Sequence, residues 1–296
     1  MTNTVSGLVQ RTLGKKAGLP VVDFSAPAGE PALAAADSVS WRVFKNPISL
    51  YIGGITAVLL ELAEPRVRTG VWEHSNFRSE PLTRMQRTGL AAMVTVYGPR
   101  SVAEEMIAGI TRMHAQVSGV TPEGQSYQAL QPELMNWVQA TASFGFLRAY
   151  HVFVQPLSQQ ERDQFYRESQ PAAQLYGATG APVSEAEQEA LFEAMLPLLR
   201  DHAIVTEFLD IMWSTPALPW PLRWLQGPCI RAAISLLPAP VQQRLGLPGT
   251  QVLSAREQRL LCRAGRWLDR LAVPGHPAVQ AARRIGLPGN TAFRRR

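Results

Sequence analysis

The sequence predicts an all-α fold, organised as a single large helical domain. From Trp41 onward, apolar residues recur at three- and four-residue spacing, and prolines and glycines interrupt this pattern at intervals typical of helix ends. No run of alternating Val, Ile or Thr bounded by Asn-Gly or Asp-Gly turns occurs in the sequence. With 296 residues, of which 46% are hydrophobic, the chain is long enough to bury a large core.

The expected helices are delimited by proline, glycine or serine. We expect them over residues 48–63, 81–97, 101–119, 132–154, 158–168, 184–199, 206–214, 229–237, 239–245, 254–271 and 277–285. Ser101, Ser158 and Ser184 are each followed three residues later by Glu, which predicts capping boxes. The 48–63 helix is shorter than a membrane span and contains Glu61, so we expect a buried core helix.

The ends of the chain differ in composition from its centre. Residues 1–40 are rich in Gly, Ala, Pro and Ser and predict a loosely ordered arm with one short helix around residues 5–13. Residues 41–290 form the predicted domain, and residues 291–296 form a basic tail. No apolar run of signal-peptide length precedes the first basic residues, so we expect a cytoplasmic protein. Cys229 and Cys262 are too few for a disulfide framework and predict core thiols.

The charge balance raises the question of polyanionic partners. Lys and Arg number 29 against 23 Asp and Glu, giving a formal net charge of +6. The basic residues are spread over many helices, and only the three terminal arginines form a cluster, so we expect no nucleic-acid partner. Trp220 and Trp224 lie near Arg223 in a proline-rich segment, which predicts either a loop folded over the core or a weak peripheral membrane contact. The sequence carries no signal for the oligomeric state.

Two helical faces carry the polar residues from which a site could be built. The three- and four-residue spacing of Arg84, Arg87 and Thr88 places them on one face, either as a solvated basic surface or as part of a site. His114 projects from an apolar helical face. There it is either a satisfied core histidine or the single neutral imidazole that a b-type haem requires of its protein. Nucleotide-binding glycine loops, a Gly-x-Ser-x-Gly motif and His-Glu-x-x-His are absent from the sequence.

The chain resembles one known family in an ordered series of segments. These are GVWEHSNFRSEPLTRMQRT, VYG, RMHAQVSG, SYQALQPELMNWV and PLSQQERDQFYRE. They lie within the region from Trp41 to Leu245, over which the chain resembles the family of rubber oxygenase (latex-clearing protein) and the fungal endoplasmic-reticulum-bound oxygenase of mycophenolic acid biosynthesis. The resemblance implies a helical domain that encloses one b-type haem and cleaves an alkene with dioxygen into carbonyl products.

Carried over residue by residue, the resemblance makes His114 the axial ligand of the haem iron. Arg84, Arg87 and Thr88 correspond to the Arg-x-x-Lys-Thr pattern on the distal side of the haem, with Arg87 in place of lysine. A guanidinium does not lose its proton to ligate iron as an amine can. We therefore expect an open or water-occupied sixth position on the iron.

Further positions depart from the family pattern or carry less specific signals. Where many relatives have Gln-x-x-His-Pro, this chain has Glu61 and Glu64 before Pro65, and it has Gln139 in Trp-Val-Gln where relatives often have His. Glu64 is a candidate general base for an allylic proton, as is Glu73, and the alternative for each is a helix-end carboxylate in water.

Aromatic residues and a further histidine are candidates for the walls of the haem or substrate pocket. Trp137, Phe144 and Tyr150 line such a pocket or pack in the core. His151 bonds a haem propionate or has a structural role.

Three functions follow from these patterns. The first is a haem b-dependent oxygenase that uses dioxygen on an apolar, unsaturated or terpenoid small molecule. The second is a non-catalytic helical protein that binds haem or an apolar ligand, as the altered Glu61, Glu64 and Arg87 positions would allow. The third is an enzyme that uses another metal in the same helical scaffold.

Overall fold

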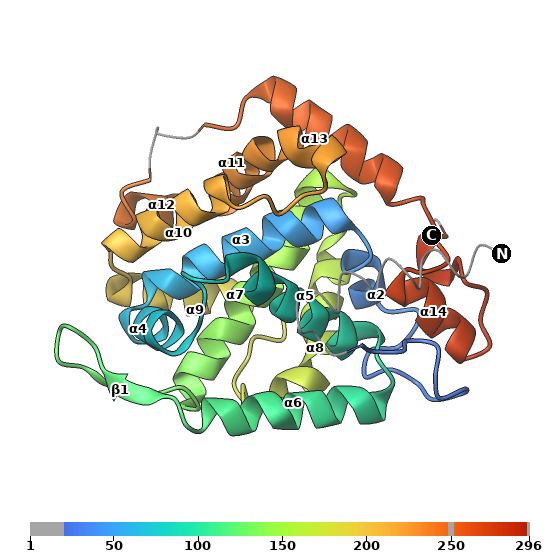
Figure 1. The fold of residues 1–296 in the computed structure, drawn as a ribbon, viewed down its shortest axis with the longest axis horizontal. Helices are drawn as coiled ribbons and strands as arrows, with labels where there is room; N and C mark the ends of the chain where they lie inside the picture. Colours follow the sequence, from blue (N-terminus) through green and yellow to red (C-terminus); the bar gives the residue numbers. More distant parts are fainter. Residues whose placement is uncertain (1–20, 248–251, 295–296) are drawn as a thin grey trace.

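The computed structural model describes residues 21–247 and 252–294, and this part of the chain is mostly helical (Figure 1). The α-helices are α2 (Val39–Val43), α3 (Pro47–Ala63), α4 (Pro65–His74), α5 (Pro81–Tyr97), α6 (Arg100–His114), α7 (Pro132–Phe153), α8 (Gln159–Leu175), α9 (Glu185–Met195), α10 (Ala203–Ser214), α11 (Gln226–Leu236), α12 (Ala239–Arg244), α13 (Ala255–Leu268) and α14 (Pro277–Arg284). Short 3-10 helices are η1 (Leu196–Leu198), η2 (Trp220–Leu225) and η3 (Thr291–Phe293). The predicted all-α architecture is confirmed in its main features.

The central contact of the fold is the crossing of α3 and α7. A Cβ atom on Gly53 of α3 would lie 2.6 Å from the carbonyl oxygen of Gly145 on α7, so the two backbones touch where neither has a side chain. Asn46 caps α3 by accepting hydrogen bonds from the amides of Ile48 and Ser49, at 3.1 and 3.3 Å. Most of α3 is buried, as its apolar sequence predicts.

Two sets of helices lie on opposite sides of α3. In Figure 1, α10, α11 and α13 lie above α3, and α5 and α6 lie below it. The largest cluster of buried apolar residues joins α3, α7, α10 and α11, and a second cluster joins α2, α5, α7, α8 and α14. Cys229 lies in the first cluster and is buried, as predicted for a core thiol, whereas Cys262 is partly exposed.

The described part of the N-terminal arm is packed against the domain. The buried guanidinium of Arg284 on α14 donates hydrogen bonds to the carbonyls of Phe24, Glu30 and Tyr97, at 2.8, 2.7 and 2.9 Å. These contacts join chain segments far apart in sequence, and the amino-acid composition of the arm does not reveal them. The expected helix over residues 5–13 lies outside the described residues, as do the last two arginines of the basic tail.

Several elements differ from the expectation. Residues 118–120 (β1) and 126–128 (β2) pair as a short antiparallel hairpin, where the sequence predicts the end of a helix and a loop. Ser101 does not cap α6. Its amide instead donates to the carboxylate of Glu30 at 2.6 Å, an acceptor supplied from outside the helix. The capping box at Ser158 is confirmed, and α8 continues beyond its predicted end through Pro171.

Two features bear on membranes. Within the described residues, no single helix is long and apolar enough to cross a membrane; α3 and α4 pass that test only as a pair, with a bend of 110° between them. Trp220 and Trp224 of η2 are 80% and 60% exposed, and so are not covered by the core. The weak peripheral membrane contact through this segment stays a prediction.

Candidate functional site

His114 is the last residue of α6, where the helix presents a half-buried face. Ile107, seven residues earlier on the same face, is buried, whereas the neighbouring Met113 is 62% exposed. Neither ring nitrogen of His114 has a hydrogen-bond partner among the described residues. Burial lowers the pKa of His114, and the positive charge of Arg84 lowers it further. The imidazole is therefore neutral at pH 7 and has a free nitrogen lone pair for a metal.

Arg84 of α5 links His114 to the other polar groups of the site. Its guanidinium donates to the Thr88 hydroxyl one turn later, and that hydroxyl donates in turn to the Arg84 carbonyl at 3.0 Å. The predicted three- and four-residue spacing thus brings Arg84 and Thr88 into contact. Burial lowers the pKa of Arg84, Glu61 opposes this shift and Arg87 adds to it. Arg87 itself is exposed, whereas Arg84 is half-buried.

Glu61 on α3 is the carboxylate that lies close to Arg84. Burial raises its pKa to about 7, an effect that the charge of Arg84 and contact with the Thr141 hydroxyl partly offset. A carboxyl group with this pKa can hold or release a proton near neutral pH. The sequence signal for it is a single charged residue in an otherwise apolar helix.

The two carboxylates expected to act as bases lie elsewhere. Glu64 is buried at the N-cap of α4, where one oxygen accepts from the Val67 amide and the other from Arg66, both at 2.8 Å. Arg66 also pairs with Glu133. Both oxygens of Glu64 are thus engaged in holding the helix end. Glu73 is exposed on α4 near Tyr127. Neither contributes to the electrostatics of His114 or Arg84.

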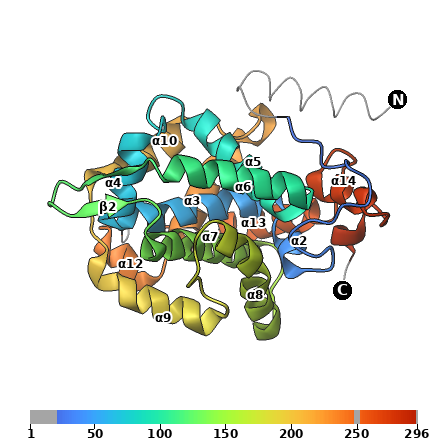
Figure 2. The same ribbon diagram turned by 90° about the horizontal axis from the view of Figure 1, so that it is seen from below.

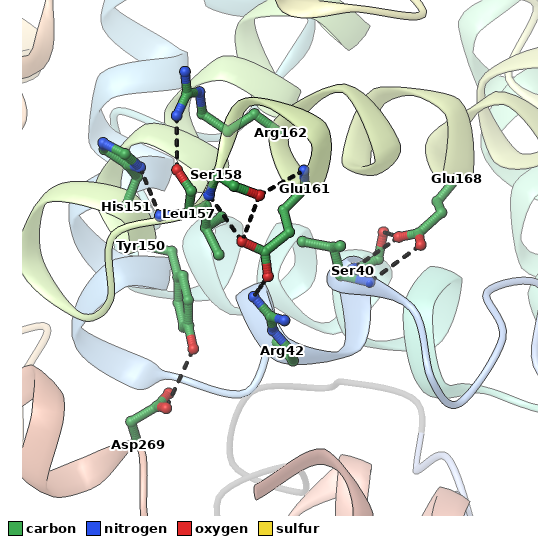
Figure 3. Close-up of polar contacts among 11 residues, drawn as sticks. Ser40, Arg42, Tyr150, His151, Leu157, Ser158, Glu161, Arg162, Glu168 and Asp269 are labelled. Carbon is green, nitrogen blue, oxygen red and sulfur yellow. Dashed lines mark hydrogen bonds and ion pairs between the residues drawn. The ribbon is translucent and has the colours of Figure 1, made fainter. Parts of the chain in front are cut away.

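Trp137 and His151 are not brought together with His114. Trp137 is fully buried and packs on Phe192 of α9, with 5.3 Å between the ring centroids. The Nδ1 atom of His151 accepts from the Leu157 amide at 3.0 Å (Figure 3). The charged residues that act on the pKa of His151 are Arg162, Arg148 and Glu185. The structure gives both residues structural contacts, and their predicted roles at a cofactor stay predictions.

The side chains that could ligate a metal determine which kind of metal centre this site can hold. Among residues 21–247 and 252–294, no three His, Cys, Asp or Glu side chains are grouped so that they could hold a metal ion. A metal bound only by protein side chains normally has three or four such ligands. His114 offers one neutral nitrogen beside a cation, and the hydroxyl of Thr111, one turn earlier, has no hydrogen-bond partner in the described part of the chain. This arrangement suits a metal that brings most of its own ligands.

Comparison with known proteins identifies the family. The model of the catalytic domain described as ER-bound oxygenase mpaB/B'/Rubber oxygenase matches residues 41–270. The chain is also 28% identical, over 177 residues, to uncharacterized proteins of Mycobacterium bovis and Mycobacterium tuberculosis; the match covers 58% of this chain and 69% of each of theirs. No solved structure gives a significant match. Because the family model covers most of the chain, this protein belongs to the ER-bound oxygenase mpaB/B' and rubber oxygenase family.

Proposed function

We propose that this protein is a haem b-dependent oxygenase that cleaves a carbon–carbon double bond of an apolar small molecule. The observation that carries the proposal is the neutral imidazole of His114, without a hydrogen-bond partner among the described residues, beside the half-buried charge of Arg84. The family is one of oxygenases, which supports the general activity. In the proposed reaction the alkene and one dioxygen give two carbonyl groups, so the atoms balance without a further reductant.

A haem held by His114 would supply the binding and activation of dioxygen. His114 would hold the haem iron, because its imidazole is neutral and its ring nitrogens have no hydrogen-bond partner among the described residues. Arg84 offers a guanidinium to an anionic group, either a propionate or an oxygen atom that gains negative charge. Thr88 holds that guanidinium in place through its hydrogen bond.

Glu61 is the proton-exchanging group of the proposal. With a pKa of about 7 it can accept a proton on a carboxylate oxygen or return one, and Arg84 lies within electrostatic range. This assigns to Glu61 the role of base that the sequence suggests for Glu64. The oxygens of Glu64 are already engaged by Arg66 and the Val67 amide.

Oxygen uptake by the haem-loaded protein tests the proposal. Squalene and its saturated analogue squalane are a matched pair of probes, and carbonyl products are trapped with a hydrazine reagent. We expect uptake and carbonyl formation with squalene or another unsaturated terpenoid, and none with squalane. Replacement of Glu61 by Gln should lower turnover at least tenfold with haem content unchanged. Haem binding without oxygen uptake on any unsaturated probe would favour the non-catalytic binding protein instead.

A further inference from the structure

A pocket lies on the side of α7 that faces away from α5 and α6. Its volume is about 860 Å³, and residues of α7, α8, α9, α11 and α12 line it. Figure 2 shows α9 and α12 across α7 from α6. Neither His114 nor Arg84, Thr88 or Glu61 lines this pocket, which is therefore separate from the site described above.

Apolar side chains make up the larger part of the walls of this pocket, beside several charged ones. Side chains from four elements contribute to them, including Phe144, Leu147, Phe192, Ile234 and Val241. Phe144 and Phe192 pack together across the α7–α9 interface with 4.9 Å between their ring centroids. Apolar walls around a volume of this size are typical of sites for small organic molecules.

Gln188 of α9 contributes an unsatisfied amide to the lining. Its side chain is only 1% exposed, and neither its amide nitrogen nor its amide oxygen has a hydrogen-bond partner among the described residues. A buried polar group without a partner is destabilising, and most such groups in folded proteins are paired. A ligand group that both donates and accepts a hydrogen bond would pair with both polar atoms of this unpartnered amide.

Several other polar groups of the pocket are engaged with the protein. Arg162 pairs with Glu185 at 2.8 Å. It also donates to the Leu157 carbonyl at 2.7 Å (Figure 3). His151 accepts from the Leu157 amide through Nδ1, and burial lowers its pKa, so the ring is neutral at pH 7. The amide of Gln188 is thus a buried group of the lining that is left to bind a ligand.

The charges around the pocket indicate an uncharged ligand. The charged side chains of the lining are the cations of Arg148 and Arg162 and the carboxylates of Glu185, Glu189 and Glu193. The carboxylates outnumber the cations by one, so the local charge does not favour a carboxylate or phosphate group on the ligand. A hydroxyl group is neutral and serves as both donor and acceptor, which matches the amide of Gln188.

We propose that this pocket is a second ligand site, which binds an uncharged apolar alcohol whose hydroxyl hydrogen-bonds to the amide of Gln188. The apolar walls hold the hydrocarbon body, and the amide selects the head group. This site goes beyond the proposed oxygenase activity and does not depend on it.

Calorimetric titration of the full chain with three probes of similar length tests the proposal. The probes are decan-1-ol, 1-methoxynonane, which accepts but does not donate, and decanoate, which is charged. We expect decan-1-ol to bind at least tenfold more tightly than either of the others. In Gln188→Leu the affinity for decan-1-ol should fall at least fivefold, while that for the ether stays the same or rises. Gln174→Leu, which changes an exposed glutamine of α8 outside the pocket, should leave all three affinities unchanged.

A second variant tests the pocket independently, in case Gln188→Leu does not fold. Ser235 is an exposed residue of the pocket lining, so Ser235→Trp narrows the pocket without altering the core, and it should weaken the alcohol and the ether together. Equal affinities for the alcohol and the ether, an unchanged preference in Gln188→Leu, or no binding of any probe would overturn the proposal. Haem retention through His114, read from the absorption spectrum, is a separate measurement, so failure here leaves the proposed function intact.

Discussion

The α3–α7 crossing and the α5–α6 pair show two opposite ways of using a helical face. At the crossing, Gly53 and Gly145 let two backbones meet, and there is no room for a methyl group. On α5, by contrast, a Cβ atom on Gly89 would meet nothing within 4 Å, and Arg84 and His114 stand nearby with partly buried polar groups. From this difference we infer that the crossing of α3 and α7 is a rigid scaffold. The side chains proposed to bind a ligand lie on α5 and α6.

The largest expected effect on stability comes from adding a methyl group where α3 and α7 cross. Gly53→Ala places a methyl group 2.6 Å from the Gly145 carbonyl oxygen, so α3 and α7 must move apart. We expect a loss of about 2–3 kcal/mol in the free energy of unfolding, measured by urea denaturation. A loss below about 0.5 kcal/mol, within the range of ordinary surface substitutions, would show that the crossing is not rigid.

A smaller effect is expected from Glu61, the polar group of α3 that faces the site. Its pKa in the folded protein, about 7, exceeds the ordinary value of 4.5, so folding favours the protonated form. This contribution to stability is fully present below pH 4.5 and is lost as the pH rises through 7. Glu61→Gln has no carboxyl group at this position, so this loss of stability with rising pH disappears. The stability of the variant relative to the parent should therefore rise by about 1–2 kcal/mol between pH 5 and pH 8, as measured by urea denaturation.

Glu64→Gln is the matched control for that change, since it lies three residues away. It removes the negative charge that pairs with Arg66 and weakens the cap on α4, so we expect a loss of about 1 kcal/mol at pH 8. A gain in stability at pH 8 for both variants would contradict the different environments of the two carboxylates.

The smallest expected effect is on α5. Gly89→Ala adds a methyl group in open space on a helix, so helix propensity should stabilise the protein by up to about 1 kcal/mol in urea denaturation. Destabilisation by this substitution would mean that α5 is packed as tightly as α3, and it would remove the contrast between the two regions.

Sequence reasoning succeeds where the controlling interactions are local. Helical spacing predicts the contact of Arg84 with Thr88, and the Ser158 capping box is formed within four residues of chain. It fails where a distant segment supplies the partner. Glu30 caps α6 in place of Ser101 from 71 residues away.

Burial also changes chemistry in ways that local patterns do not reveal. Glu61 and Glu64 are alike in sequence, yet one carries a raised pKa near Arg84 and the other holds a helix end. Gln188 lies in an ordinary polar helix, and only the folded structure shows that its amide is buried without a partner among the described residues. These differences depend on tertiary contacts, which the spacing of residue types along one helix cannot encode.

The most direct test of the account is the absorption spectrum of the purified protein after haem addition, recorded for the parent, His114→Ala and His74→Ala. His74 is the exposed last residue of α4 and serves as the matched control. We predict a Soret band at one haem per chain for the parent and for His74→Ala, and its loss in His114→Ala. A parent that takes up no haem, or His114→Ala with the parent spectrum, would contradict the account.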